Sequence, residues 1–261
     1  MLYVGTAGWS IPKLHADAFP AEGSHLARYA ARLPAVEINS SFYRPHRPAT
    51  YARWAASVPD GFRFSAKVPK AATHEARLRG PDAVAALERF LGEVRELGDR
   101  LGPLLVQLPP KLSYDGETAR AFLGAMRERF DGLVALEPRH ATWFDDEAAR
   151  LLVEHRVARV AADPPKGAPA AADPGGWDGL VYIRWHGSPK MYYSPYPPEE
   201  LEKAAAALRA ARGRGAEAWA IFDNTADGHA WGDALAVWAL SGPGGPPLAY
   251  GSARPAFGRG T

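Results

Sequence analysis

The chain has 261 residues, 47% of them hydrophobic and 23% charged, and a formal net charge of +2. This composition supports a substantial core and excludes disordered and coiled-coil proteins. Because the sequence contains no cysteine, it excludes disulfides, thiolate metal sites, iron–sulfur clusters and a cysteine nucleophile.

The charge balance also bears on partners. Residues 241–261 contain Arg254, Arg259 and no acidic residue, so the rest of the chain carries 29 basic and 29 acidic residues. A neutral body argues against a protein whose main work is binding nucleic-acid backbones. The chain opens on the strand-like Leu2-Tyr3-Val4, and no apolar run approaches the about 20 residues of a membrane span. We therefore expect a cytoplasmic protein without a membrane partner.

Strand-like runs alternate with amphipathic helical stretches along the chain. The predicted strands are Leu2–Trp9, Ala35–Phe42, Phe62–Val68, Pro103–Leu108, Leu133–Arg139, Val157–Asp163, Leu180–His186 and Glu217–Asp223. The predicted helices are Ser24–Leu33, Ala49–Val58, Pro81–Leu97, Glu117–Phe130, Asp145–His155, Pro198–Ala211 and His229–Leu240. Ser24 is suited to cap the first helix. Only the interval Pro164–Asp178 shows no helical pattern.

Eight strands joined by helices predict an α/β fold with parallel strands. Eight units in about 240 residues are typical of a single (β/α)8 TIM-barrel-like domain, here residues 1–240, followed by a flexible Gly/Pro-rich tail over residues 241–261. An open, doubly wound sheet is the alternative, although no glycine-rich dinucleotide fingerprint follows the first strand. Pro164–Asp178 and Ser188–Pro197 are long loops, which often cover the active sites of barrels.

Polar residues collect near the carboxyl ends of the predicted strands, where barrel active sites form. Alternate residues of a strand share a face. The residues that do so are Glu37 with Asn39, Ser65 with Lys67, Glu137 with Arg139, and Tyr182 with Arg184 and His186, while Gln107, Asp163 and Asp223 end their strands. Parallel strands are normally apolar on both faces, so this pattern favours a functional mouth over a buried polar network that satisfies only itself.

Six short motifs follow one another along the chain. They are Gly5-Thr6-Ala7-Gly8-Trp9-Ser10; Val36-Glu37-Ile38-Asn39-Ser40-Ser41-Phe42-Tyr43-Arg44; Phe64-Ser65-Ala66-Lys67-Val68-Pro69 with Thr73-His74; Gln107-Leu108-Pro109-Pro110; Glu137-Pro138-Arg139-His140 with Trp143; and Arg184-Trp185-His186-Gly187. Together they resemble the domain-of-unknown-function 72 (YecE-like) family over residues 1 to about 240.

The resemblance implies a TIM-barrel-like fold and no established reaction. Similarity to metal-dependent apurinic endonuclease barrels is a proposal at the level of fold, which is a weak guide to function. Pro138 stands where the family more usually has Phe or another apolar residue. Because this position points to the other face of the strand, Glu137 and Arg139 should keep their places.

Four residues are the catalytic candidates. Glu37 and Glu137 could supply the acid and base of a two-carboxylate mechanism, with His186 and Asp163 as further candidates. Glycosidase chemistry depends on the separation of the two carboxylates, which the sequence does not give. There is no Gly-x-Ser-x-Gly elbow and no P-loop motif, so serine-hydrolase and nucleoside-triphosphatase interpretations are set aside.

Lys67, Arg139 and Arg184 are candidates for holding a phosphate or carboxylate. Two interpretations of Arg184 stay open: an inward guanidinium pairs with a protein carboxylate such as Glu137 or Asp163, or it meets a ligand anion. Possible oxygen and nitrogen ligands of a divalent metal are His74, His140, His186, Glu37, Glu137 and Asp163. No tight ligand spacing occurs and the nearby cations oppose a metal ion, so we predict no cofactor.

Aromatic side chains near strand ends could stack against a base or a sugar. The aromatic substrate-binding candidates are Trp9, Tyr43, Trp143 and Tyr192. The polar ones, besides the three cations, are Asn39, His74, Gln107, His140, Asp223 and Asn224. Trp54, Trp219, Trp231 and Trp238 are expected to pack in the core or on helices.

The leading hypothesis is therefore a hydrolase- or lyase-like enzyme that acts on a small anionic substrate, phosphorylated or sugar-containing, in the mouth of the barrel. Nucleic-acid binding or repair is the first alternative, with Trp9 and Tyr43 holding an extruded base. A non-catalytic ligand-binding barrel is the second. Arg184 and His186 are expected to form the anion-binding end of the site with the Ser188–Pro197 loop.

Overall fold

The computed structural model describes residues 1–242. Its strands are β1 (Leu2–Thr6), β2 (Ala35–Ile38), β3 (Arg63–Lys67), β4 (Leu101–Gln107), β5 (Val134–Glu137), β6 (Val157–Arg159), β7 (Ala161–Asp163), β8 (Gly175–Gly176), β9 (Leu180–Trp185) and β10 (Glu217–Phe222). Its α-helices are α1 (His25–Ala30), α2 (Ser40–Tyr43), α3 (Pro48–Ala56), α4 (Gly80–Val94), α5 (Gly116–Arg127), α6 (Asp146–Glu154), α7 (Pro198–Gly213) and α8 (His229–Ser241). Short 3-10 or π turns are η1 (Lys13–Ala18), η2 (Ala71–Glu75), η3 (Arg95–Arg100), η4 (Ala141–Phe144) and η5 (Pro169–Ala172).

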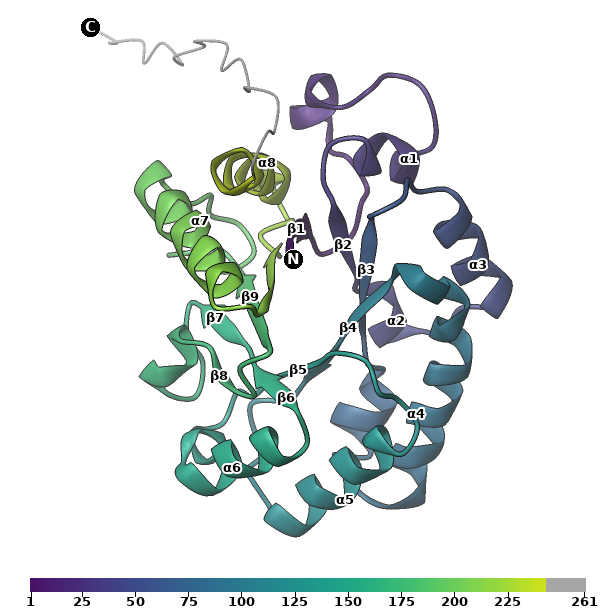
Figure 1. Ribbon diagram of the computed structural model, residues 1–261, viewed down its shortest axis with the longest axis vertical. Coiled ribbons are helices and arrows are strands. Elements are labelled where there is room, and N and C mark those ends of the chain that lie inside the picture. Colours follow the sequence, from purple (N-terminus) through teal and green to yellow (C-terminus); the bar gives the residue numbers. More distant parts are fainter. Residues whose placement is uncertain (243–261) are drawn as a thin grey trace, which may run out of the picture.

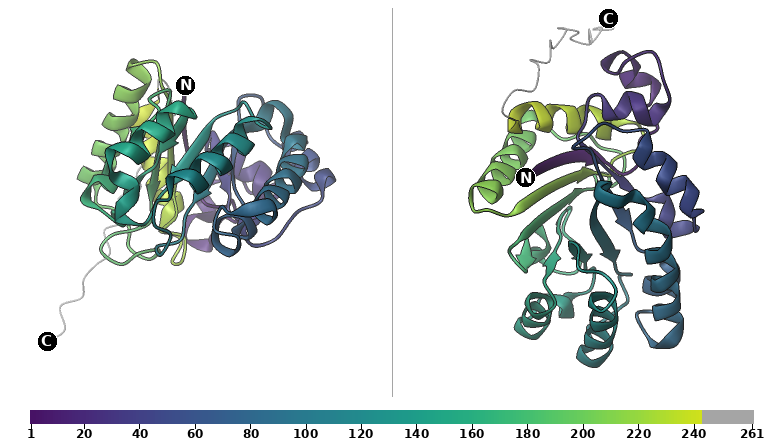
Figure 2. Two further views of the ribbon diagram at one scale, coloured as in Figure 1. Left: turned by 90° about the horizontal axis from the view of Figure 1, so that it is seen from below. Right: turned by 45° about the vertical axis from the view of Figure 1, so that its right-hand side comes forward.

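The strands lie inside a surround of helices, with α3 to α8 on the outside (Figure 1; Figure 2 gives two further views). Hydrogen bonds join them in two sheets, of order β1-β10-β9-β7 and β2-β3-β4-β5-β6-β8. All pairs are parallel except β6 with the short β8. The α/β, TIM-barrel-like fold expected from the sequence is confirmed.

The predicted sixth strand connects the two sheets. It divides at Val160 into β6, which pairs with β5, and β7, which pairs with β9. The interval after it contains no α-helix, as the missing pattern predicted, and holds only η5 and β8. On the other side of the ring, β1 and β2 share a single bridge between Ala7 and Glu37.

A tyrosine hydroxyl joins β1 to β2. Tyr29 of α1 is fully buried, accepts a hydrogen bond from Thr6 N at 2.9 Å and donates one to Ala35 O at 2.9 Å. Gly5 permits this close approach, because a Cβ there would lie 2.0 Å from Ala35 O. The two strands therefore meet through one side chain rather than through a continuous ladder.

Predicted and observed strand ends differ at two places that matter for the site. The first strand stops at Thr6 rather than Trp9, because Gly8 turns the chain with a φ of 102° and its N–H bonds Thr6 O and Glu37 O. The second stops at Ile38, and Ser40–Tyr43 form α2 instead of the last strand residues. Beyond these points, alternation along a strand no longer decides which way a side chain faces.

Inside the ring of strands, apolar side chains fill the end near the amino termini of the strands, and polar side chains fill the end near their carboxyl termini. Trp219 is fully buried inside, where Tyr3 lies 4.7 Å from it and Tyr182 stacks on it at 6.0 Å between ring centroids. Trp219 was expected in packing, and it fills the interior itself. Towards the carboxyl ends of the strands the buried residues are charged. The fold thus closes the lower end and places the chemistry at the mouth.

The boundary between domain and tail was predicted at residue 240, whereas α8 continues to Ser241. Residues 243–261 of the predicted tail lie outside the described part of the chain. None of the helices in residues 1–242 combines the length and apolarity required to cross a bilayer.

Candidate functional site

Arg184, in β9, is the centre of the polar layer. Its Nε and Nη2 make a bidentate pair with the carboxylate of Glu37, at 3.0 and 2.8 Å. Its Nη1 lies 2.7 Å from Glu137 Oε2, and its Nη2 lies 3.1 Å from Asp223 Oδ2. Arg184 and Glu37 are both 0% exposed. Of the two interpretations of Arg184 that the sequence left open, the structure has the pairing with protein carboxylates.

Glu137, the last residue of β5, collects further donors. Its Oε1 accepts hydrogen bonds from Gln107 Nε2 at 3.0 Å and Arg139 Nε at 2.9 Å. Burial opposes ionisation, but the charges of Arg184, His186 and Arg139 outweigh it and hold the pKa of Glu137 well below 4.5. A carboxylate held ionised in this way is a poor proton donor, so the arrangement does not suit a glycosidase acid.

Tyr182 completes the floor of this network. Its hydroxyl lies 2.9 Å from Glu37 Oε2 and 2.8 Å from Ser65 Oγ. Burial, then the charge of Glu37, raises its pKa well above 10, so the phenol stays protonated and donates. Tyr182 and Ser65 were not among the predicted site residues, although their strand parity, shared with Arg184 and Lys67, was the signal that could have found them.

His186 lies between two carboxylates. Its Nδ1 is 3.0 Å from Asp223 Oδ2, and its Nε2 is 3.5 Å from Glu137 Oε1. Burial would lower its pKa, but Glu137 and the hydrogen bond to Asp223 raise it above 6.5. For Asp223, burial is outweighed by Arg184 and His186, so the pKa falls below 3.8. The pair can therefore store a proton on the imidazole.

Cations form the outer layer of the site. Lys67 Nζ donates to Asn39 Oδ1 at 3.2 Å. Arg139 Nη2 lies 2.8 Å from Glu137 Oε1 but makes no aligned hydrogen bond to any described residue. The pKa of His74 is lowered by burial and then by the charges of Lys67 and Arg139, and its ring packs edge-on against Phe42 at 4.9 Å between centroids.

The Ser188–Pro197 loop covers His186. The Tyr192 ring meets the imidazole edge-on at 5.9 Å, and Tyr192 N donates to His186 O. Asn224 Nδ2 anchors the loop by donating to Ser194 O at 3.0 Å and to Asp233 Oδ2 at 2.7 Å. Tyr192 thus lies where it was predicted, whereas Asn224 supports the loop and is buried beneath it.

Asp163 does not join the cluster, contrary to its prediction as a catalytic residue. It is in register with Trp185, whose parity is opposite to that of Arg184. Its Oδ2 accepts from the Tyr196 hydroxyl at 2.6 Å, and it lines an outer cavity of about 490 Å³ between β7, β9 and α7. This cavity occupies the place where the sixth helix of the repeat is missing.

Three more predicted residues pack elsewhere. Trp9 meets Trp54 edge-on at 4.9 Å, outside the polar cluster. Trp143 is 1% exposed and donates from its indole to Leu112 O. His140 caps η4 by accepting from Thr142 N. Trp9 and Trp143 lie outside the polar cluster for the same reason: each large aromatic ring next to a strand end packs against apolar neighbours among the helices.

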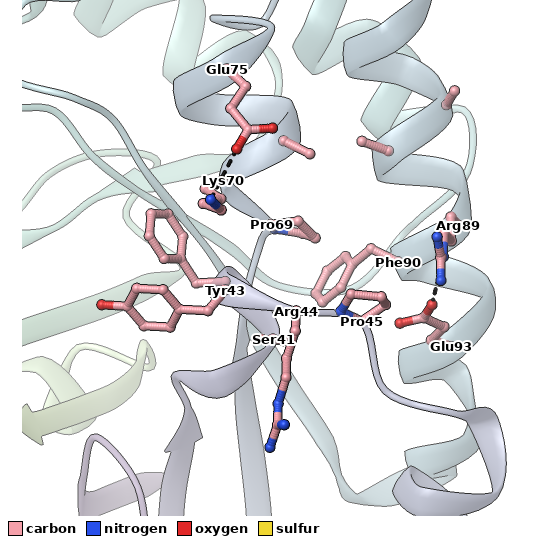
Figure 3. Close-up of a pocket in the computed structure, with 14 residues that line it drawn as sticks. Ser41, Tyr43, Arg44, Pro45, Pro69, Lys70, Glu75, Arg89, Phe90 and Glu93 are labelled. Carbon is pink, nitrogen blue, oxygen red and sulfur yellow. Dashed lines mark hydrogen bonds and ion pairs between the residues drawn. The ribbon is translucent and has the colours of Figure 1, made fainter.

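Tyr43 also leaves the mouth. It lies at the end of α2, is 64% exposed, and lines a cavity of about 420 Å³ between α2 and α4. Figure 3 shows Tyr43 there, with the Lys70–Glu75 and Arg89–Glu93 ion pairs on separate sides of the cavity. Phe42 separates this cavity from Lys67, because Nζ lies 4.2 Å from its ring centroid.

The acidic and histidine side chains considered as metal ligands are arranged differently. Within residues 1–242, no three His, Asp or Glu side chains come together in a way that could hold a metal ion. The carboxylates that could have served, Glu37, Glu137 and Asp223, face guanidinium and imidazole groups instead.

The family model described as "Protein of unknown function DUF72" matches residues 3–252 of the chain. The protein belongs to the DUF72 family. The DUF72 chain is 33% identical to the UPF0759 protein YecE of Escherichia coli over 109 residues, which are 42% of this chain and 38% of YecE. It is 26% identical to the UPF0759 protein YunF of Bacillus subtilis, over 55% of this chain and 52% of YunF. These matches therefore span about half or less of the curated relatives.

Solved DUF72 structures share the fold over most of their length. A DUF72 protein from Enterococcus faecalis superposes with a TM-score of 0.77 at 23% identity, covering 92% of this chain and 95% of that one. A DUF72 protein from Thermotoga maritima gives a TM-score of 0.74 at 25% identity, covering 92% and 98%. The family resemblance expected from the six motifs is confirmed.

The site makes the stability of this DUF72 protein depend on pH. The pKa of Glu137 is lowered, so its contribution to the free energy of unfolding is complete above pH 4.5 and is lost as the pH falls. The pKa of His186 is raised, so its contribution is complete below pH 6.5 and is lost as the pH rises through its folded value. A tenfold difference in a proton dissociation constant between the folded and unfolded states corresponds to about 1.4 kcal/mol.

His186→Gln removes the second effect alone. We expect wild type to exceed the variant in free energy of unfolding most below pH 6.5, and the difference to shrink as the pH rises above it. Urea denaturation over a series of pH values measures it. His155→Gln, on a histidine after α6 that bonds Leu151 O outside the site, is the control. A constant difference for His186→Gln would contradict the prediction.

Proposed function

We propose that this DUF72 protein is an enzyme whose barrel mouth binds a small anionic substrate. The observation that carries the proposal is the order of charge in the site. Glu37, Glu137 and Asp223 all pair with Arg184. Lys67 makes no ion pair within 4.0 Å among residues 1–242, and Arg139 Nη2 lies 2.8 Å from Glu137 Oε1 without an aligned hydrogen bond. A phosphate or carboxylate would supply the missing acceptors.

His186 and Asp223 support the acid/base part of the proposal better than Glu37 and Glu137 do. Both glutamates are almost fully enclosed by donors, and Glu137 is held ionised. The raised pKa of His186 favours a protonated imidazole that can donate a proton, and Asp223 orients its ring through Nδ1. Substrate would reach this pair by displacing Tyr192, which lies on an irregular loop.

Nucleic-acid binding loses the features on which it depended. This alternative used Trp9 and Tyr43 as the aromatic platform, but Trp9 packs against Trp54 and Tyr43 lines the cavity between α2 and α4. A non-catalytic barrel would bind an anion with the same two cations, Lys67 and Arg139, which we call the anion seat. Turnover of a substrate therefore distinguishes the enzyme from the non-catalytic barrel.

The test is binding of inorganic phosphate by calorimetry. Losing a charge-assisted hydrogen bond costs about 1.5–3 kcal/mol, so Arg139→Gln should weaken phosphate binding about tenfold or more. Lys70→Gln, an exposed lysine paired with Glu75, is the matched control and should bind as wild type does. Equal affinity in Arg139→Gln and wild type would refute the anion seat. Affinity for a single-stranded oligonucleotide that falls steeply with salt would restore the nucleic-acid alternative.

A further inference from the structure

Lys67 is held on a rigid part of the fold with its side chain in the mouth. It is the last residue of β3 and has the inward parity of Ser65. Its carbonyl oxygen accepts a hydrogen bond from Ser41 Oγ at 2.7 Å, and the same hydroxyl lies 2.8 Å from Ile38 O. This link between β2 and β3 fixes the backbone from which the amine extends.

The surroundings of the Lys67 amine differ from those of other lysines. Lys70 and Lys203 are exposed and pair with carboxylates at 3.1 and 2.6 Å. Lys67 is 5% exposed, and its Nζ contacts an amide oxygen and the Phe42 ring instead. An ammonium ion in such a place lacks both full hydration and a counter-ion, so it is destabilised relative to the ammonium of an exposed lysine.

The titration of Lys67 agrees with this geometry. Burial first, and then the charge of Arg184, lower its pKa to about 8 against the pull of the three carboxylates. At pH 7.5 a lysine of pKa about 8 is about one-quarter unprotonated, whereas one of pKa 10.5 is about one-thousandth unprotonated. Unprotonated amines are nucleophiles towards carbonyl carbon.

We propose that Lys67 is a nucleophile that forms an imine with a small aldehyde or ketone carrying an anionic group. The inference rests on the proposed anion seat, in which Arg139 would bind the phosphate or carboxylate of that substrate while the Lys67 amine reacts with its carbonyl group. The Nζ lone pair forms a bond to the carbonyl carbon, and nitrogen releases one proton while the carbonyl oxygen takes one up to give a carbinolamine. The nitrogen lone pair then forms the C=N bond as the C–OH bond breaks. The hydroxyl takes up one proton and leaves as water, and nitrogen releases its second proton, so that amine and carbonyl give imine and one water.

Neighbouring groups fit this sequence of steps. Asn39 Oδ1 accepts a hydrogen bond from Nζ and orients the amine. Lys67 Nζ and the His74 ring both pack against Phe42, at 4.2 and 4.9 Å from its ring centroid, and the lowered pKa of His74 favours its neutral, proton-accepting form. An imine is an electron sink, which makes carbon–carbon cleavage or isomerisation next to the former carbonyl the class of reaction that this site would support.

The experiment traps the imine. Wild-type protein is incubated at about pH 7.5 with glycolaldehyde phosphate and sodium cyanoborohydride, and the labelled lysines are located by peptide mass spectrometry. We expect Lys67 to be labelled at least about tenfold faster than any other lysine, with a rate that rises with pH around its lowered pKa. Labelling of Lys67 no faster than of Lys70 would overturn the proposal.

Two variants and a second probe separate the causes of failure. Lys67→Arg keeps the positive charge and should lose the label, while Lys70→Arg should leave labelling of Lys67 unchanged. Glycolaldehyde without phosphate should label Lys67 more slowly than glycolaldehyde phosphate does. If both probes label Lys67 equally, the result supports Lys67 as the nucleophile and refutes binding of the phosphate at the anion seat. If wild type binds phosphate but Lys67 stays unlabelled, the result supports the anion seat and refutes imine formation.

Discussion

Replacement of Arg184 by methionine is expected to lower the free energy of unfolding by at least about 3–5 kcal/mol, the cost of leaving one buried charge unpaired. Arg184 forms ion pairs with three carboxylates rather than one, and its side chain is 0% exposed. Glu37 would be left with the Tyr182 hydroxyl as its donor. The variant should therefore be largely unfolded, or recover only when its carboxylates are protonated at low pH. Urea denaturation followed by circular dichroism measures the change.

Arg120→Met is the matched control, because Arg120 pairs with Glu154 at the surface with 57% of its side chain exposed. Surface ion pairs contribute little, so this variant should unfold at nearly the wild-type urea concentration. Arg184→Lys should be intermediate, since it keeps the charge and loses the bidentate fork. Equal stability of Arg184→Met and Arg120→Met would show that the network does not hold the fold.

Gly5→Ala is expected to produce the second large loss of stability. Its Cβ would lie 2.0 Å from Ala35 O and 3.1 Å from Tyr29 Oη, so β1 would have to move away from β2. Overpacking typically costs about 1–3 kcal/mol and more where backbone must shift, so we expect at least about 3 kcal/mol. The thermal or urea midpoint should fall accordingly.

Gly92→Ala is the opposite case within the same chain. Gly92 lies inside α4, and a Cβ there meets nothing within 4 Å. Alanine restricts the unfolded chain and favours a helix, so this variant should gain about 0.5–1 kcal/mol. If Gly5→Ala were as stable as Gly92→Ala, the backbones of β1 and β2 would not be in close contact at Gly5.

Alternation along the strands predicted much of the site. Glu37, Glu137, Arg184 and His186 were assigned to one face from period-two spacing, and all four lie in the cluster. The rule depends on regular extended backbone. It does not apply to Tyr43, which was selected only as an aromatic residue near a strand end, because the chain enters α2 after Ile38.

The pairing of charges could not be predicted in the same way. Arg184 and Glu37 are separated by 147 residues, and which carboxylate reaches which nitrogen depends on the stagger of strands that are not neighbours in sequence. Asp163 illustrates the limit: as a strand-terminal acid it looked equivalent to Asp223, but its register with Trp185 turns it outward. The face on which a side chain lies depends on local backbone, whereas its ion-pair partner depends on how the two sheets are arranged in space.

The pairing of β1 has a consequence for biosynthesis. Its ladder is with β10, and it has one bridge to β2, so β1 leaves the ribosome well before the strand with which it pairs. About 210 residues separate Thr6 from Glu217. At about 5–20 residues per second, translation leaves the amides of β1 without their partner for about 10–40 s. During that interval the β2–β6 sheet can assemble on its own, while the Leu2–Thr6 edge remains a template for chaperones or for mispairing.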